Sequence, residues 1–135
     1  MHTRQDIINY CLTLENSFYD TPFTDPNWEV VRHKENNKVF AWIFEKDDKV
    51  WVNVKCDPQW RDLWRSTYES VLPGWHLNKE YWNSIILDGD VPDVEIQRMI
   101  AESYDLTFSK KKNKLGVAKE VDSGNNGDST QKESN

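Results

Sequence analysis

Apolar residues recur every three or four positions in three stretches of the chain, a spacing typical of helices that bury one face. The pattern predicts helices over 3–14, 58–72 and about 92–104. Asp57 and Pro58 are typical residues at a helix start, because the carboxylate can accept a backbone N–H and proline has none to satisfy. We expect each helix to pack one face on a common core.

Between the first two helices the spacing changes to alternation, which is typical of β-strands. Strands are predicted over 28–33, 39–45 and 50–56, joined by turns rich in Asn, Asp and Lys. An irregular edge strand is predicted at 17–23 and a further strand at 81–88. Three helices and four to five antiparallel strands in the order α-β-β-β-β-α-β-α define an α+β domain.

The chain contains seven tryptophans, and the patterns assign several of them to the core. Trp60 and Trp64 lie on the predicted inward face of the second helix, and we expect both to be buried, as well as Trp42. Strict alternation along the 39–45 strand places Phe40, Trp42 and Phe44 on one face.

One tryptophan has two interpretations. Trp51 shares a strand face with Asn53 and Lys55. An exposed ring beside a lysine and an amide can stack on a nucleobase or contact a protein partner. Large aromatic side chains are more often covered, so we favour burial of Trp51.

The chain divides into two parts of different composition. All seven Trp, five Tyr and five Phe lie within 1–108, whereas 109–135 contains no aromatic residue and only Leu115, Val117 and Val121 as large aliphatic residues. Such a segment cannot bury enough apolar surface to offset the entropy lost on ordering. We therefore predict one folded domain over 1–108 and a disordered tail over 109–135.

Charge is also distributed unevenly. Residues 1–108 contain 11 Lys and Arg against 19 Asp and Glu, a net charge of −8, whereas 109–135 contain six Lys against four acidic residues, a net charge of +2. An acidic domain does not favour broad, non-specific contact with a phosphate backbone. Nucleic-acid binding would need a local group of basic residues.

The sequence has no motif for an enzyme, a metal site or a cofactor. The three histidines lack a His or Cys partner at metal-ligand spacing, and there is no glycine-rich phosphate loop or nucleophile motif. Cys11 and Cys56 fit buried free thiols in a reducing cytoplasm. No apolar run is long enough to span a membrane, and the polar N-terminus does not resemble a signal peptide. We expect a monomeric, cytoplasmic binding protein without a cofactor or enzymatic activity.

The densest group of polar and aromatic residues lies at 73–89, between Pro-Gly and Asp-Gly turn signals. It brings His76, Asn78 and Lys79 close together in sequence. Lysines near hairpin tips can contact phosphates, although they also keep a sheet edge soluble. The basic residues that flank the two predicted hairpins are Arg32, Lys34, Lys38, Lys46 and Lys49.

Several runs of this chain resemble the MmcQ/YjbR family of small bacterial proteins. They are PGWHLNK at 73–79, YWNSI at 81–85, LDG at 87–89, VPD at 91–93 and ESYDL at 102–106. The resemblance extends over about 3–108 and implies a CyaY-like, frataxin-related α+β fold. Members of the family are commonly described as DNA-binding proteins with a double-wing surface, which implies that hairpins of this chain would contact DNA.

The leading hypothesis is therefore DNA binding with modest affinity through the hairpin wings and the His-x-Asn-Lys loop. One alternative is a protein-interaction module that uses exposed aromatic residues such as Trp51 and Trp75. A less favoured alternative is a frataxin-like metal binder. The residues predicted to bind nucleic acid are His76, Asn78, Lys79, Arg32, Lys34, Lys38, Lys46 and Lys49.

Overall fold

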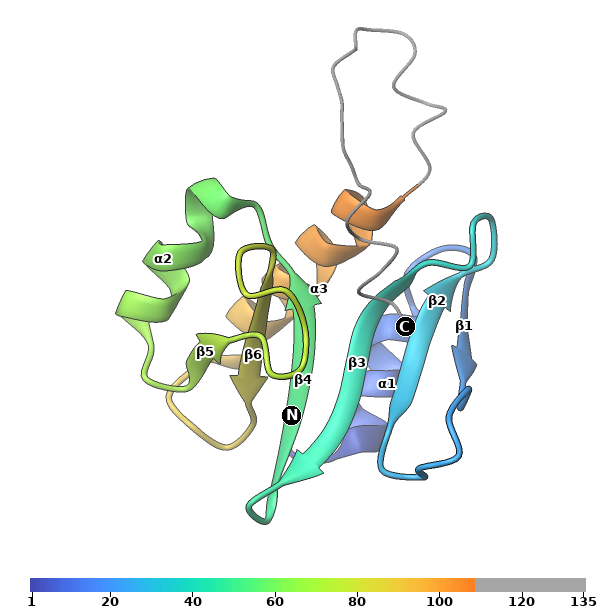
Figure 1. Ribbon diagram of the computed structural model, residues 1–135, viewed down its shortest axis with the longest axis horizontal. Coiled ribbons are helices and arrows are strands. Elements are labelled where there is room, and N and C mark those ends of the chain that lie inside the picture. The colour runs from blue at the N-terminus through green and yellow to red at the C-terminus, as the bar shows by residue number, and fades with distance from the viewer. Residues whose placement is uncertain (109–135) are drawn as a thin grey trace, which may run out of the picture.

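The computed structural model describes residues 1–108, and the predicted tail at 109–135 lies outside the described residues. Six antiparallel strands form one sheet, and two of the three helices lie behind it (Figure 1). The predicted α+β class is confirmed. In chain order the elements are α1 (Arg4–Leu12), β1 (Ser17–Asp20), β2 (Glu29–His33), β3 (Val39–Lys46), β4 (Lys49–Lys55), α2 (Pro58–Thr67), β5 (Val71–Pro73), β6 (Trp82–Ile86) and α3 (Asp93–Thr107).

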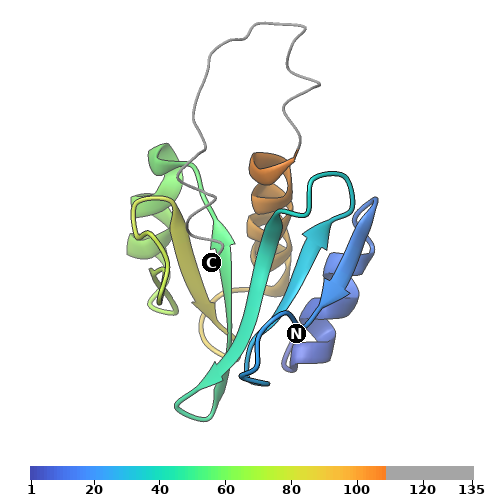
Figure 2. The ribbon, with the colours of Figure 1, turned by 45° about the vertical axis from the view of Figure 1, so that its right-hand side comes forward.

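The strands lie in the order β1-β2-β3-β4-β6-β5. The first four are antiparallel neighbours in chain order: a longer loop over 21–28 joins β1 to β2, and short turns join β2 to β3 and β3 to β4. The chain then passes through α2 to the far edge, and β6 returns between β4 and β5. In the turned view of Figure 2, α1 and α3 stand behind the sheet while α2 lies beside its β5 edge. None of these helices is long and apolar enough to cross a membrane, within the described residues.

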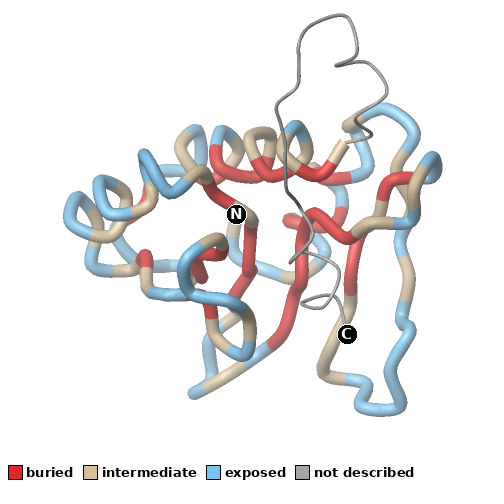
Figure 3. The backbone as a smooth tube through the Cα atoms, turned by 45° about the horizontal axis from the view of Figure 1, so that its top comes forward, coloured by how far each residue is buried: buried red, intermediate tan, exposed pale blue. Residues whose placement is uncertain are grey.

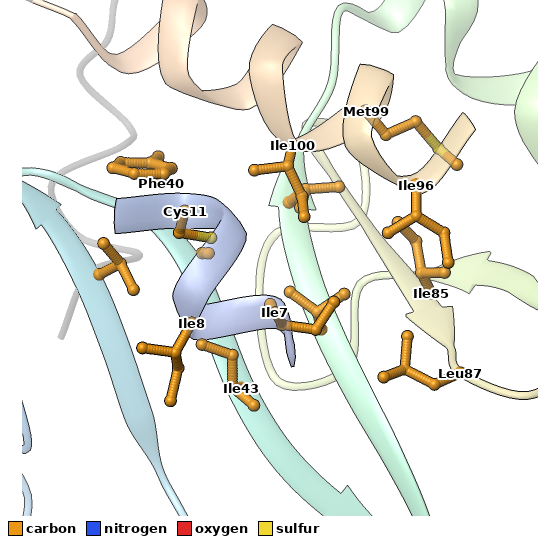
Figure 4. Close-up of a cluster of buried hydrophobic side chains, with 14 of the residues drawn as sticks. Ile7, Ile8, Cys11, Phe40, Ile43, Ile85, Leu87, Ile96, Met99 and Ile100 are labelled. Atoms are coloured by element: carbon orange, nitrogen blue, oxygen red, sulfur yellow. The ribbon is translucent and has the colours of Figure 1, made fainter. Parts of the chain in front are cut away.

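The main core lies between the sheet and the two helices behind it (Figure 4). A capping box starts α1: the Thr3 hydroxyl accepts from the Asp6 backbone N–H, and the Asp6 carboxylate accepts from that of Thr3. This core holds α1 and α3 on the face of the sheet toward which their apolar sides point. Its labelled residues are Ile7, Ile8, Cys11, Phe40, Ile43, Ile85, Leu87, Ile96, Met99 and Ile100.

The predicted alternation of β3 is wrong at two residues, Val39 and Phe40, because Val39 packs on the side of Trp42 and Phe40 on the side of Ala41. Val31 pairs with Ala41 and Arg32 with Val39, so Phe40 is an extra residue without a partner in β2. Such a β-bulge shifts the alternation, and Phe40 packs in the helix-side core while Trp42 packs on the opposite side.

The second helix also differs from the prediction in its length and its burial. It ends at Thr67, and Val71 pairs with Ile85 as part of β5, so the sheet gains a sixth strand. Trp60 is 48% exposed, contrary to the expectation that it belongs to the core. Trp64 is half-buried and packs against the main core. Figure 3 shows α2 in tan and pale blue, without a buried residue.

Candidate functional site

The sheet has two chemically different faces. We call the side that packs on α1 and α3 the helix face, and the opposite side the aromatic face. Trp42, Phe44, Trp51 and Trp82 lie on the aromatic face, because the bulge and the strand register turn them away from the helices. No helix within residues 1–108 covers the centre of this face (Figure 1).

Strand register also sorts the charged residues between the faces. Cross-strand partners point to the same side of a sheet. The acidic residues Glu29 and Glu45 point to the helix face, where Arg4 lies 2.9 and 3.1 Å from their carboxylate oxygens. Of the strand residues on the aromatic face, one is acidic, Asp20, whereas four are basic. These are Arg32, Lys46, Lys49 and Lys55.

Aromatic rings form a continuous layer over this face. Trp28 stacks on Phe44 with ring centroids 4.5 Å apart, and Trp75 stacks on Phe44 at 5.3 Å. The His76 ring lies on Trp75 at 3.9 Å and is exposed, whereas Trp28 and Trp75 are half-buried. Phe23 extends the layer, because its ring stacks on that of Trp42 with centroids 6.0 Å apart. The Phe23 side chain is 37% exposed. We call the four accessible rings, Phe23, Trp28, Trp75 and His76, the aromatic platform.

Two buried polar side chains fix the 74–81 loop on the sheet. Asn53 of β4 donates from Nδ2 to the Trp75 carbonyl (2.9 Å), and the Trp75 backbone N–H donates to Ser84 Oγ (2.9 Å). Ser84 Oγ in turn donates to Asn53 Oδ1. Both polar groups of the Trp75 backbone are therefore satisfied by side chains of adjacent strands, and the indole ring is held over Phe44.

Arginines from α2 hold the other side of the same loop. Arg65 donates from Nε to Asn83 Oδ1 (2.7 Å) and from Nη2 to both the Lys79 and the Trp82 carbonyls. Arg61 donates to the Glu80 carbonyl (3.1 Å). Burial lowers the pKa of Arg65, because a guanidinium loses hydration where it packs against the loop.

His76 has an unusual backbone conformation. Its φ is 68°, in the left-handed region, and the other non-glycine residues with positive φ within 1–108 are all Asn or Asp. Side chains other than Asn and Asp enter this region at some cost, so surrounding contacts must hold them there. The hydrogen bonds from Asn53 and Ser84 to the Trp75 backbone, which we call the Trp75 clamp, supply such contacts. They place the His76 imidazole on top of the aromatic platform.

The other two predicted loop residues serve the loop itself. Asn78 Oδ1 accepts from the Glu80 backbone N–H (2.8 Å), and its carbonyl accepts from Trp82 (3.0 Å). Lys79 Nζ donates to the Gly74 carbonyl at 2.9 Å. His76 is therefore the predicted loop residue whose side chain faces outward as part of a surface.

The predicted hairpin residues do not gather at one place. The turn after β2 and the turn after β3 lie at opposite ends of β3, which has eight residues and spans about 26 Å. Lys34 and Lys38 therefore lie at one end of the sheet, and Lys46 and Lys49 at the other. Arg32 is in an ion pair with Asp20 at 2.8 Å.

The structure does bring one predicted lysine to the rings. Lys46 Nζ lies 5.1 Å from the Trp51 ring centroid and 5.3 Å from that of Trp75, and it also pairs with Asp47 at 3.0 Å. Trp51 is 6% exposed, so the favoured interpretation of this residue, burial, is confirmed. Its indole N–H donates to the Lys46 carbonyl (3.1 Å).

Two contributors to this face were missing from the predicted site. Lys55 Nζ lies 5.9 Å from the Trp82 ring, and alternation along its strand had already placed it beside Trp51. Trp28 stacks on Phe44 and Trp75, and no local sequence signal marks that contact.

The described residues offer little for metal or nucleophile chemistry. Within 1–108, no three His, Cys, Asp or Glu side chains are grouped to hold a metal ion. Cys11 and Cys56 are buried free thiols, as predicted. Burial raises the pKa of each thiol to about 12, which disfavours the thiolate that a nucleophile requires.

Comparison with known proteins places the chain in a family. Over residues 12–106 it matches the sequence model of the YjbR family. It is 33% identical over 118 residues to the uncharacterized protein YyaQ of Bacillus subtilis (strain 168), covering 79% of this chain and 99% of that one. It is 29% identical over 105 residues to the uncharacterized protein YjbR of Escherichia coli (strain K12), covering 76% of this chain and 84% of that one.

Solved structures show the same fold. A Deinococcus radiodurans protein superimposes with a TM-score of 0.74 and 28% identity over 90% of this chain and 94% of that one. A Pseudomonas syringae protein superimposes with a TM-score of 0.71 and 26% identity over 78% of this chain and 99% of that one. The matched segment includes the 74–81 loop and most of the strands that hold it. The chain belongs to the YjbR family.

Proposed function

We propose that this protein is a non-enzymatic binding protein that binds single-stranded nucleic acid on its aromatic face. The observation that carries the proposal is the aromatic platform, a set of accessible rings fixed on a sheet face that also carries the basic strand residues. Bases of any sequence can stack on such rings while nearby cations meet the phosphates.

The charge distribution favours single strands over duplex. The domain is acidic overall, so contacts to many phosphates at once are unfavourable. Stacking on His76 and Trp75 needs unpaired bases, which a duplex does not present. The face carries four basic strand residues, and two of them, Arg32 and Lys46, are in ion pairs with carboxylates, so we expect few phosphate contacts, about two.

The wing hypothesis receives less support from the geometry. A duplex held by both hairpins would have to extend along the whole of β3, because their tips lie at opposite ends of that strand. The protein-interaction alternative named Trp51 and Trp75, and of these Trp51 is covered. Both alternatives remain outcomes of the test below.

Fluorescence anisotropy with labelled oligonucleotides tests the proposal. We expect single-stranded DNA or RNA to bind more tightly than duplex of the same length, with a shallow salt slope of about −1.4 for two phosphate contacts. The H76A variant should bind at least about fivefold more weakly, since one stacked base contributes about 1 kcal/mol or more.

The matched control is R98Q, because Arg98 is an exposed cation on α3 behind the sheet. It should bind like the wild type. A preference for duplex that depends on Lys34 and Lys38 would support the wings instead. Absence of binding at low salt would exclude nucleic acid as the ligand.

A further inference from the structure

Two lysines face each other at the end of the hairpin that joins β3 to β4 (Figure 1). Lys46 is the last residue of β3 and pairs with Lys49, the first residue of β4, so both side chains leave the sheet on its aromatic face. Directly opposed residues have Cβ atoms about 4.5–5.5 Å apart, and like charges in such a pair destabilise it. The hairpin therefore places two ammonium groups where a single anion can contact both.

The Lys46 ammonium lies beside the aromatic platform. Its Nζ is 5.1 Å from the centroid of the Trp51 ring and 5.3 Å from that of Trp75, distances at which an indole ring attracts a cation. The exposed His76 ring lies on the same Trp75 ring, with centroids 3.9 Å apart. A base that stacks on His76 therefore brings its own phosphates close to Lys46.

A carboxylate of the hairpin turn holds Lys46 in the free protein. Asp47 Oδ2 lies 3.0 Å from Lys46 Nζ. The Asp47 side chain is 77% exposed and that of Lys46 is 31% exposed. An ion pair so open to solvent is weak, so a phosphate can replace the carboxylate at little cost.

We propose that Lys46 and Lys49 share one phosphate of the bound single strand, and that Asp47 is an internal competitor for this phosphate site. In the free protein the Asp47 carboxylate pairs with Lys46, and the phosphate takes its place when a strand binds. Asp47 therefore lowers the affinity of the aromatic face for nucleic acid. This inference rests on the proposed function and adds to it a residue that sets the affinity of the same site.

The neighbouring residue Asp48 provides a matched control. Asp47 and Asp48 form the two-residue turn between the strands, and both have positive φ, at 54° and 63°. Asparagine is accepted in this conformation as readily as aspartate. D47N and D48N thus remove the same charge from the same turn without straining it, and D47N alone removes the carboxylate that pairs with Lys46.

Fluorescence anisotropy of a labelled single-stranded oligothymidylate, titrated with the full-length variants at low salt, tests the competitor role. We expect D47N to bind about two- to fivefold more tightly than D48N, the range that an exposed ion pair supplies. In the K46Q background the difference between D47N and D48N should disappear, because Asp47 then has no Lys46 ammonium to hold.

The salt dependence of the same titrations tests the shared phosphate. Each phosphate contact with a single strand contributes about −0.7 to the slope of log K against log salt. Replacing both lysines, in K46Q/K49Q, should therefore make the slope shallower by about 0.7. A change of about 1.4 would give each lysine a phosphate of its own and overturn the shared site.

The outcomes separate this inference from the function on which it rests. Equal affinities of D47N and D48N, with clear binding by the wild type, would overturn the competitor role and leave the proposed function standing. A difference between them that persists in K46Q would also overturn it, because Asp47 would then act without Lys46. If neither the wild type nor any variant bound the oligonucleotide, the proposed function would fail and this inference with it.

Discussion

Replacing Asn53 with alanine tests whether buried hydrogen bonds hold the 74–81 loop on the sheet. Asn53 is fully buried, donates to the Trp75 carbonyl at 2.9 Å and accepts from the Ser84 hydroxyl. The variant leaves both of these groups without that partner. Each buried polar group left unsatisfied costs about 1–3 kcal/mol, so with two such groups the free energy of unfolding should fall by about 2–6 kcal/mol.

Urea unfolding followed by tryptophan fluorescence measures this change. The control is N9A, because Asn9 is exposed on α1 and its side-chain oxygen accepts a hydrogen bond from the exposed Gln5 side chain. Surface substitutions of this kind alter the free energy of unfolding by less than about 0.5 kcal/mol. If N53A proved as mild as N9A, the clamp would not be what holds Trp75 over the sheet.

Three further predictions use the same protein. The W60A variant should lose less than about 1 kcal/mol of unfolding free energy, because Trp60 is largely exposed. The W82A variant should lose about 3–5 kcal/mol, because Trp82 is fully buried. Equal losses in the two variants would contradict this burial pattern. Burial lowers the pKa of His33 to about 4, so the unfolded chain binds more protons below about pH 6.5, and stability should fall by up to about 3 kcal/mol as the pH drops toward 4. The H33Q variant should lack that part of the pH dependence. If H33Q and the wild type lost the same stability between pH 6.5 and 4, His33 would not be the cause. Cys11 and Cys56 should react with a thiol reagent at pH 8 only after unfolding, since burial raises their pKa values to about 12; fast labelling of the native protein would contradict this.

Regular local patterns predicted the fold class and most of the elements. Alternation along β4 correctly separated Val52 and Val54 on the helix face from Trp51 and Asn53 on the aromatic face. The same rule failed in β3, because the bulge at Phe40 depends on the pairing with β2 and leaves no trace in the local pattern.

The candidate site was less predictable, because it depends on contacts between distant segments. His76 could be singled out from its neighbours, but Asn53 and Ser84 are separated by 31 positions and meet only through the pairing of β4 with β6. The spacing of Trp60, Leu63 and Trp64 showed which side of α2 is apolar. It could not show that the two arginines of this helix would face the protein instead.

Chemical-shift mapping with single-stranded DNA tests the central claim most directly. In a titration of the ¹⁵N-labelled protein, the account predicts that the indole N–H signals of Trp28 and Trp75 and the backbone amide of His76 move together, while signals from α1 and α3 stay in place. Shifts confined to the turns around Lys34 and Lys49, or to α2, would contradict the account, as would a spectrum that does not change at low salt.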